Sequence, residues 1–141
     1  MKMSLSTYGM EELTDALLRL ASSDFEPAVT EALTIGGEIA VRRLKESADE
    51  HHGGGTGRMR DSITANEPTV SRWGGYLEIK LKGTVSKGWR YRDQGAELNY
   101  GSGRRIASGW FDEGSEVAQP EVEQSMVETL EAWIAASDIG A

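Results

Sequence analysis

The side chains best suited to binding a metal lie in one short stretch, Asp49-Glu50-His51-His52. Carboxylates and imidazoles are common ligands, but adjacent histidines at a helix end point in different directions, and nothing nearby supplies a matched third ligand. Protonated histidines there would instead interact favourably with the negative end of the helix dipole. We therefore expect a solvated helix end and no metal site.

The glycine run that follows, residues 53–58, has the composition of a phosphate-binding loop. It lacks the Gly-Lys-Ser/Thr ending, and it follows a predicted helix, whereas a nucleotide-binding loop follows a strand. Hydrolase chemistry has no support either, because there is no Gly-x-Ser-x-Gly turn and both histidines share one helix end. With no cysteine for thiol chemistry, we expect a protein without cofactors that is not an enzyme.

Arginines and aromatic residues alternate in the second half of the chain and could contact single-stranded nucleic acid or an acidic protein surface. The formal charge of −8 and the pI near 4.8 disfavour tight binding to a phosphate backbone and favour a protein partner. A plain solvated loop is the simplest alternative. The candidate interface residues are Thr56, Gly57, Arg58, Arg60, Trp89, Arg90, Arg92, Tyr100, Arg104 and Arg105.

These residues must be positioned by a small fold, since 141 residues suit a single domain, 1–141, with one core. The first residues lack the apolar run of a signal peptide, and no window approaches the roughly 20 apolar residues of a membrane span. We expect a protein that is made and used in the cytoplasm and has no membrane partner.

Helical spacing dominates residues 8–52. A short helix is predicted from about Met10 to Ala21, and Asp24 ahead of Pro27 indicates the start of a longer one. Glu38 and Arg42 could pair one turn apart. The Gly36-Gly37 pair costs helix stability, so we favour close packing there over a hinge. The predicted buried face is Val29, Leu33, Gly36, Ala40 and Leu44, widened by Ala32, Ile35 and Ile39.

Beyond the long helix, residues 53–64 predict a glycine turn followed by one helical turn from Arg58 to Ile63. Residues 68–111 read as a β-rich part. Its clearest strand is Tyr76–Lys82, in which apolar and polar residues alternate, and Val70–Trp73 would pair with it through a Gly74-Gly75 turn. Residues 89–92 form a third strand candidate, and residues 95–109 a long surface loop.

Residues 112–137 contain the closing helix, predicted from near Pro120 to Ala136. Val122, Met126, Leu130 and Ile134 repeat every four residues, with Trp133 beside them and Glu121, Glu123, Glu128 and Glu131 on the outer face. The predicted fold class is α+β. The long helix and the carboxy-terminal helix should cover one face of a three- or four-stranded antiparallel sheet.

Three segments resemble a known family. Residues 56–63 resemble a recurring Thr-Gly-x-Leu-x-x-Ser-Ile stretch, with Met59 as the apolar residue. Residues 89–95 resemble a strand that usually reads Tyr-Ala-x-x-x-Glu-Phe-Gly, with Asp93-Gln94 in place of Glu-Phe. Residues 109–114 lie where a Pro-Phe pair is usual, and the proline is missing. Together they resemble the neck and tail-completion proteins of long-tailed bacteriophages.

The resemblance implies a structural virion protein of the head-tail junction, assembled in the host cytoplasm as a ring of identical subunits. Its partners would be other connector, tail terminator or tail tube proteins, with non-specific passage of DNA. Within the subunit Thr56-Gly57 would turn the chain, Ile63 would insert under the sheet, and Trp110-Phe111 would dock the closing helix. Two alternatives stay open: a tail terminator that caps the tail tube, and a small nucleic-acid-binding module.

Overall fold

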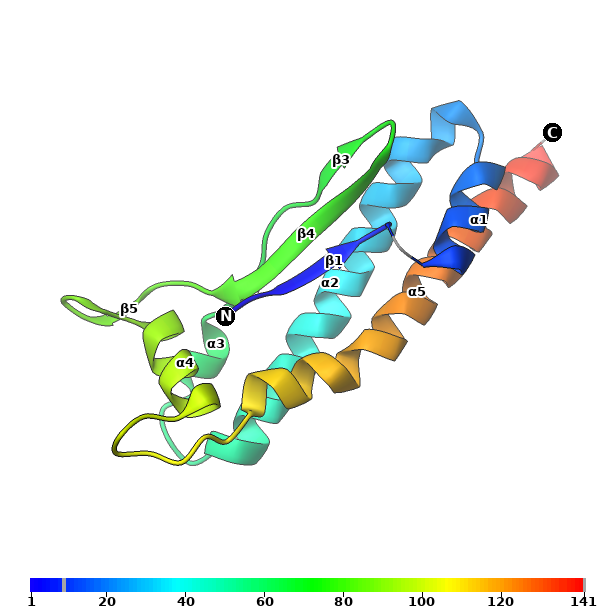
Figure 1. Cartoon of the computed structure of the whole chain (residues 1–141). Helices are drawn as coiled ribbons and strands as arrows, with labels where there is room; N and C mark the ends of the chain where they lie inside the picture. Colours follow the sequence, from blue (N-terminus) through cyan, green and yellow to red (C-terminus); the bar gives the residue numbers. More distant parts are fainter. Residues whose placement is uncertain (9, 141) are drawn as a thin grey trace.

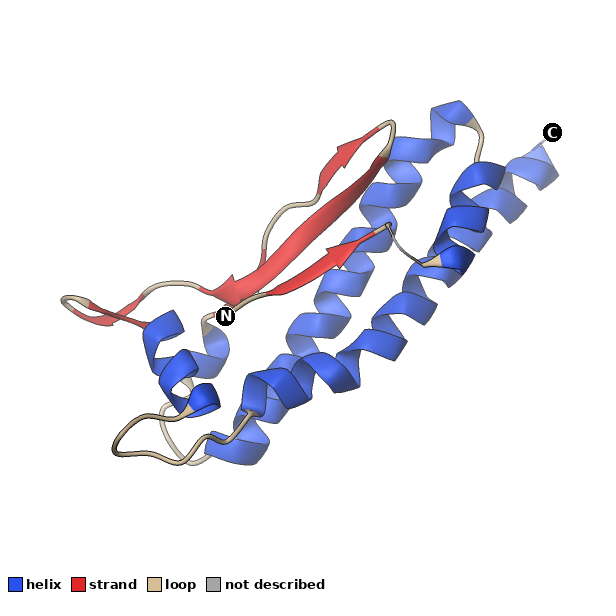
Figure 2. Cartoon of the chain, viewed as in Figure 1, coloured by secondary structure: helices blue, strands red, loops and turns tan. Residues whose placement is uncertain are grey.

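The computed structural model describes residues 1–8 and 10–140, with side chains up to residue 137. It confirms the predicted mixture of long helices and small antiparallel sheets (Figures 1 and 2). In chain order the elements are β1 (Met3–Ser6), α1 (Glu11–Arg19), α2 (Ser22–His52), α3 (Arg58–Asp61), β2 (Ile63–Ala65), β3 (Thr69–Ser71), β4 (Gly74–Leu81), β5 (Thr84–Ser86), β6 (Trp89–Arg90), α4 (Tyr91–Tyr100) and α5 (Trp110–Gly140).

Helices α2 and α5 run side by side for most of the length of the molecule (Figure 1). The predicted apolar stripe of α2 is buried from Val29 to Leu44, except that Ile35 and Ile39 are only half-buried. Val122, Met126 and Leu130 of α5 pack into the same core. The predicted helix start was wrong by two residues: Asp24 lies inside the first turn, where its carboxylate faces the positive end of the helix dipole.

The Gly36-Gly37 pair is explained by close packing, as predicted. A Cβ atom on Gly36 would lie 3.2 Å from side-chain atoms of both Leu5 and Val122, and one on Gly37 would lie 3.1 Å from Leu77. The two glycines therefore let β1, β4 and α5 approach the α2 backbone, and the tight contact offsets their poor helix propensity.

Strand β4 is the centre of a four-stranded antiparallel sheet, with β1 on one edge and both β2 and β3 on the other. β1 was not predicted, although Met3 and Leu5 alternate with serines. The turn between β3 and β4 was misplaced: Ser71 pairs with Gly74, so residues 72–73 make the turn. Gly75 belongs to the strand, where it pairs with Val70, and the position requires glycine because a Cβ there would come within 2.9 Å of Leu33 on α2.

The third predicted strand is right only for Trp89 and Arg90, since the chain turns into helix α4 at Tyr91. The backbone N–H of Arg90 donates to Asp93 Oδ2 at 3.1 Å, which starts a helix where the family pattern suggested a strand. The predicted surface loop of residues 95–109 is therefore limited to residues 101–109, and the part called β-rich contains a helix.

Helix α5 begins at Trp110, ten residues before the predicted start, and it packs along α2 rather than mainly on the sheet. Glu121 was expected on its outer face but bridges to α2, accepting hydrogen bonds of 2.7 Å from both Arg42 and Arg43. The hydrogen bond from Arg43 is the main reason that the pKa of Glu121 is lowered. Arg42 also pairs with Glu46, at 3.9 Å, in place of the expected Glu38.

Within the described chain, no helix has a stretch both long and apolar enough to span a bilayer.

Candidate assembly interface

The predicted interface residues come from separate segments, and the fold brings these segments to one end of the molecule. Figure 1 shows α3, α4 and β5 together at the end where α2 finishes and α5 begins. A cleft of about 270 Å³ joins them, lined by the glycine loop after His52, by Arg58 and Arg60, and by Val85 and the inner face of α4. We call this region, residues 53–60 and 83–109, the distal end.

The glycine loop is held by Arg60, which is therefore less free than predicted. Arg60 Nη1 lies 3.1 Å from Asp49 Oδ1, and Nε lies 3.0 Å from Asp61 Oδ1. Hydrogen bonds from Arg60 to Asp61 and Asp49 raise its pKa. Gly57 has a φ of 76°, and a Cβ on it would come within 2.5 Å of the Arg60 guanidinium, so glycine is needed for this turn. Thr56 and Arg58 stay exposed.

The β5–β6 hairpin projects beside α4 and is exposed along its whole length, from Lys82 to Arg90. Its apolar side chains, Val85 and Trp89, are 41% and 37% exposed. Arg92, at the start of α4, is also exposed, and its Nε lies 3.9 Å from Asp93. The hairpin therefore contributes little to the core and presents polar and apolar groups to solvent.

The loop between α4 and α5 is anchored at both ends. Asn99 is buried, and its Oδ1 accepts hydrogen bonds from the backbone N–H groups of Phe111 (2.8 Å) and Asp112 (3.2 Å), which caps α5. Ser108 Oγ donates to the Leu98 carbonyl at 2.8 Å, next to the start of α5. The cap was missed because it joins residues twelve or more positions apart.

The two histidines connect the end of α2 to this loop and to the first turn of α5. His52 Nε2 lies 2.8 Å from Ser108 Oγ, and because that hydroxyl already donates to Leu98, the imidazole must be the donor. Burial lowers the pKa of His52, and the nearby charges of His51 and Arg105 lower it further. His51 pairs with Glu113. Within the described residues no group of three ligand-type side chains could hold a metal.

The three predicted anchors are buried, but Ile63 does not insert under the sheet from a helical turn: α3 ends at Asp61, and Ile63 is the first residue of strand β2. Ile63 is 2%, Trp110 0% and Phe111 3% exposed. The indole Nε1 of Trp110 donates to the Gly95 carbonyl at 3.0 Å, which ties α5 to α4, and the Trp110 carbonyl accepts from Ser47 Oγ at 2.6 Å. Trp110 thus joins α5 to both α4 and α2 from the centre of the core.

The charge of the chain is unevenly distributed. Residues 80–105 contain seven basic and two acidic side chains, whereas residues 110–141 contain eight acidic and no basic ones. Several of these basic residues line a cleft of about 540 Å³ between the sheet and the hairpin. Glu78 also lines this cleft, and its carboxylate pairs with Lys2 at 3.0 Å. The basic residues that line this cleft are Lys2, Lys80, Lys82, Arg90 and Arg92.

Exposed apolar side chains accompany these charges at the end of α4 and on the loop that follows it. Tyr100 is 60% exposed and Ile106 is 96% exposed, between the exposed arginines of residues 104–105 and Ala107. Sequence reasoning selected Tyr100, Arg104 and Arg105 but missed Ile106. The sequence feature that could have indicated Ile106 is its position as a single branched aliphatic residue in a loop of glycines, serines and arginines.

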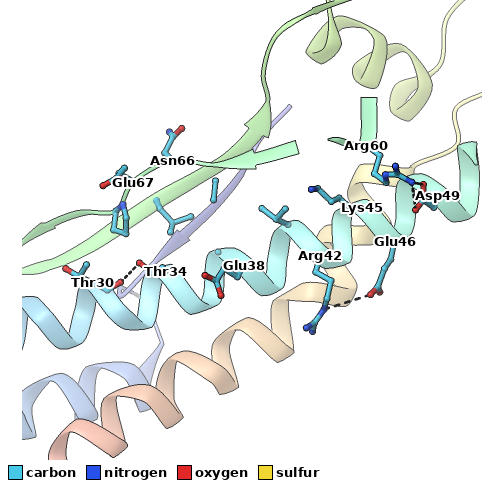
Figure 3. A pocket seen from close by; sticks show the side chains of 15 residues that line it. Thr30, Thr34, Glu38, Arg42, Lys45, Glu46, Asp49, Arg60, Asn66 and Glu67 are labelled. Carbon is cyan, nitrogen blue, oxygen red and sulfur yellow. Dashed lines mark hydrogen bonds and ion pairs between the residues drawn. The ribbon is translucent and has the colours of Figure 1, made fainter. Parts of the chain in front are cut away.

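A second feature that was not predicted is a groove of about 730 Å³ between α2 and the β2–β3 edge of the sheet (Figure 3). Its floor is apolar, formed by Val41, Ala65, Pro68 and Leu77. The helical periodicity of the sequence predicted that Val41 lies outside the buried stripe of α2. In the structure Val41 is half-exposed, at the point where the sheet no longer covers α2.

Comparison with known proteins gave no matching family, no matching curated protein and no matching solved structure.

Proposed function

We propose that this protein is a structural subunit of a bacteriophage head-tail junction, a neck or tail-completion protein that acts by forming a ring and without catalysis. The supporting observation is the convergence of the sequence-selected residues at one end of the fold. Thr56, Arg58, Trp89, Arg92 and Tyr100 come from four segments and lie at the distal end, apart from the helical core.

The distribution of charge suits contacts between identical subunits. A contact between two different surfaces of one protein repeats around an axis and closes when the rotation divides a full turn. The basic distal end attracts acidic surfaces of another copy, and such attraction speeds encounter and sets orientation. In the same ring, acidic side chains facing a channel would not retain passing DNA.

The decisive experiment is a mass measurement of the purified protein alone and after mixing with tail tubes or with filled heads. A ring subunit should give one defined multimer, or bind tubes or heads at fixed stoichiometry. A chain that stays monomeric in all three conditions contradicts the proposal. Normal maturation of particles in which its gene is deleted would contradict it equally.

The tail terminator alternative shares the ring and differs in position. Locating the subunit in a reconstruction of the virion distinguishes the two, because a terminator caps the tail tube while a neck protein lies between it and the capsid.

The cationic cleft beside the hairpin favours nucleic-acid binding as a second candidate function. Lysines and arginines release counterions from a phosphate backbone, so binding that depends on them falls steeply with salt. Titration of single-stranded and duplex DNA against the protein at several salt concentrations tests this. Nanomolar binding with a steep salt dependence would support it, and Lys82→Ala with Arg92→Ala should then reduce both the affinity and the slope. Binding that is weak at low salt contradicts it.

A further inference from the structure

We propose that the subunits join by inserting the loop of residues 101–109 of one copy into the α2/β2–β3 groove of the next copy, with Ile106 as the central contact. This inference rests on the proposed ring and specifies its contact.

The loop has the form of an inserting element. Ile106 is almost completely exposed at 96%, which is unusual for an aliphatic side chain because its hydration is unfavourable. The loop's ends are fixed by Asn99 and Ser108, so its tip is presented by a rigid support. A preorganised loop loses less conformational entropy when it binds than a free one.

The groove has the complementary form. Its volume, about 730 Å³, is far larger than one side chain needs, and its floor consists of the half-buried Val41, Ala65 and Pro68 above the buried Leu77. An isoleucine entering it exchanges water for apolar contacts on both sides. A single well-buried contact of this kind commonly dominates an interface.

The charges beside each surface also match. Arg104 and Arg105 immediately precede Ile106 and make no ion pair with any described residue. On the groove, the exposed Glu38 and Glu67 lie on opposite rims (Figure 3) and likewise make none within the described chain. The arginines that line the groove are already occupied, Arg42 by Glu46 and Glu121, and Arg60 by Asp49 and Asp61.

Lys45 is the remaining cation of the groove lining, and it lies toward the end that holds Asp49 and Arg60, away from Glu67 (Figure 3). The Glu38–Glu67 part of the groove is therefore the acidic part, where the two arginines of the loop would lie. Because loop and groove share no residue, the copy that supplies its loop keeps its own groove free and its neighbour keeps its loop free, so the contact can repeat.

The first experiment measures self-association of the full chain by sedimentation. Ile106→Ser should weaken association at least about tenfold, since it removes the buried aliphatic group. Leu18→Ser is the matched control, because Leu18 is also highly exposed, at 79%, but lies on α1. It should associate as the native chain does.

The second experiment reverses the charges, all at exposed positions that should leave the fold intact. Arg104→Glu with Arg105→Glu, and separately Glu38→Arg with Glu67→Arg, should each abolish association. Mixing the two variants should restore it, because every contact in an alternating assembly then joins opposite charges. Arg19→Glu with Arg72→Glu, at positions away from both surfaces, makes the same change in net charge as the Arg104→Glu/Arg105→Glu variant and should not weaken association.

The proposed contact is overturned if Ile106→Ser associates as the native chain does, or if mixing the two charge-reversed variants does not restore association. Neither result contradicts a ring formed by the native chain through another contact. A native chain that is monomeric at all concentrations also overturns self-docking. The proposed function is then decided separately by whether the chain enters particles. Binding of DNA by the loop, lost in Arg104→Glu with Arg105→Glu while association is unaffected, overturns the contact in favour of a nucleic-acid surface.

Discussion

The α2–α5 body and the distal end differ in what their side chains contact. In the body, apolar residues face each other across two long helices, and the arginines of α2 are paired with Glu46 and Glu121. At the distal end, the hairpin is exposed throughout, and Trp89, Tyr100 and Ile106 face solvent in a region where Arg104 and Arg105 make no ion pair with a described residue. The comparison indicates that stability resides mainly in the body, while the distal end is shaped for contact with another molecule.

The strongest test of the comparison removes the anchor that connects the two regions. Trp110→Ala should lower the free energy of unfolding by about 3–5 kcal/mol, because it leaves a large cavity and frees the Gly95 carbonyl. Urea denaturation measures the loss. Trp73→Ala, at a position 71% exposed, should change it by less than about 1 kcal/mol. If Trp110→Ala and Trp73→Ala lowered the free energy of unfolding by the same amount, Trp110 would not be an anchor of the fold.

A smaller loss is expected at the cap of α5. Asn99→Ala leaves the buried N–H of Phe111 without its partner and should cost about 1–3 kcal/mol. Hydrogen exchange should show faster opening of residues 91–112 than of α2. Asn66→Ala, where the side chain makes no hydrogen bond to a described residue, is the control. Uniform loss of protection over the whole chain would mean that the two regions unfold together.

A weaker effect should appear with pH. Since the pKa of His52 is lowered in the folded state, the unfolded chain takes up a proton more readily. The stability that the neutral His52 side chain contributes is fully present above the ordinary histidine pKa, near 6.5. It is lost as the pH falls toward the pKa of His52 in the folded chain. Unfolding curves between about pH 8 and pH 5 should show the loss in the native chain and a smaller one in His52→Gln. Identical slopes would contradict the prediction.

The smallest effect on stability is expected from the hairpin. Val85→Ser with Trp89→Ser should change the free energy of unfolding by less than about 1 kcal/mol, since neither side chain packs in or against the hydrophobic core. Thermal unfolding measures this, and Leu77→Ser, at a buried position of β4, is the contrasting variant and should be strongly destabilised. A large loss in the double variant would place the hairpin in the stable body.

Several features could be predicted because they depend on neighbours in the sequence. The buried face of α2 follows from residues three and four apart, the alternation of Leu77, Ile79 and Leu81 from the strand repeat, and the α2 end from the glycines after His52. The interface residues were predicted from their types, yet the sequence did not indicate that Thr56 and Trp89 belong to one end.

Tertiary structure alone decided the rest, because the determining contacts join distant residues. Position 75 of β4 requires glycine because Leu33 of α2 approaches it, and α5 starts at Trp110 because Asn99 caps it from α4. The groove exists only where the sheet leaves Val41 uncovered. Local sequence sets the periodicity of each element. Which polar groups find a partner, and which apolar side chains stay uncovered, depends on which elements the folded chain brings together.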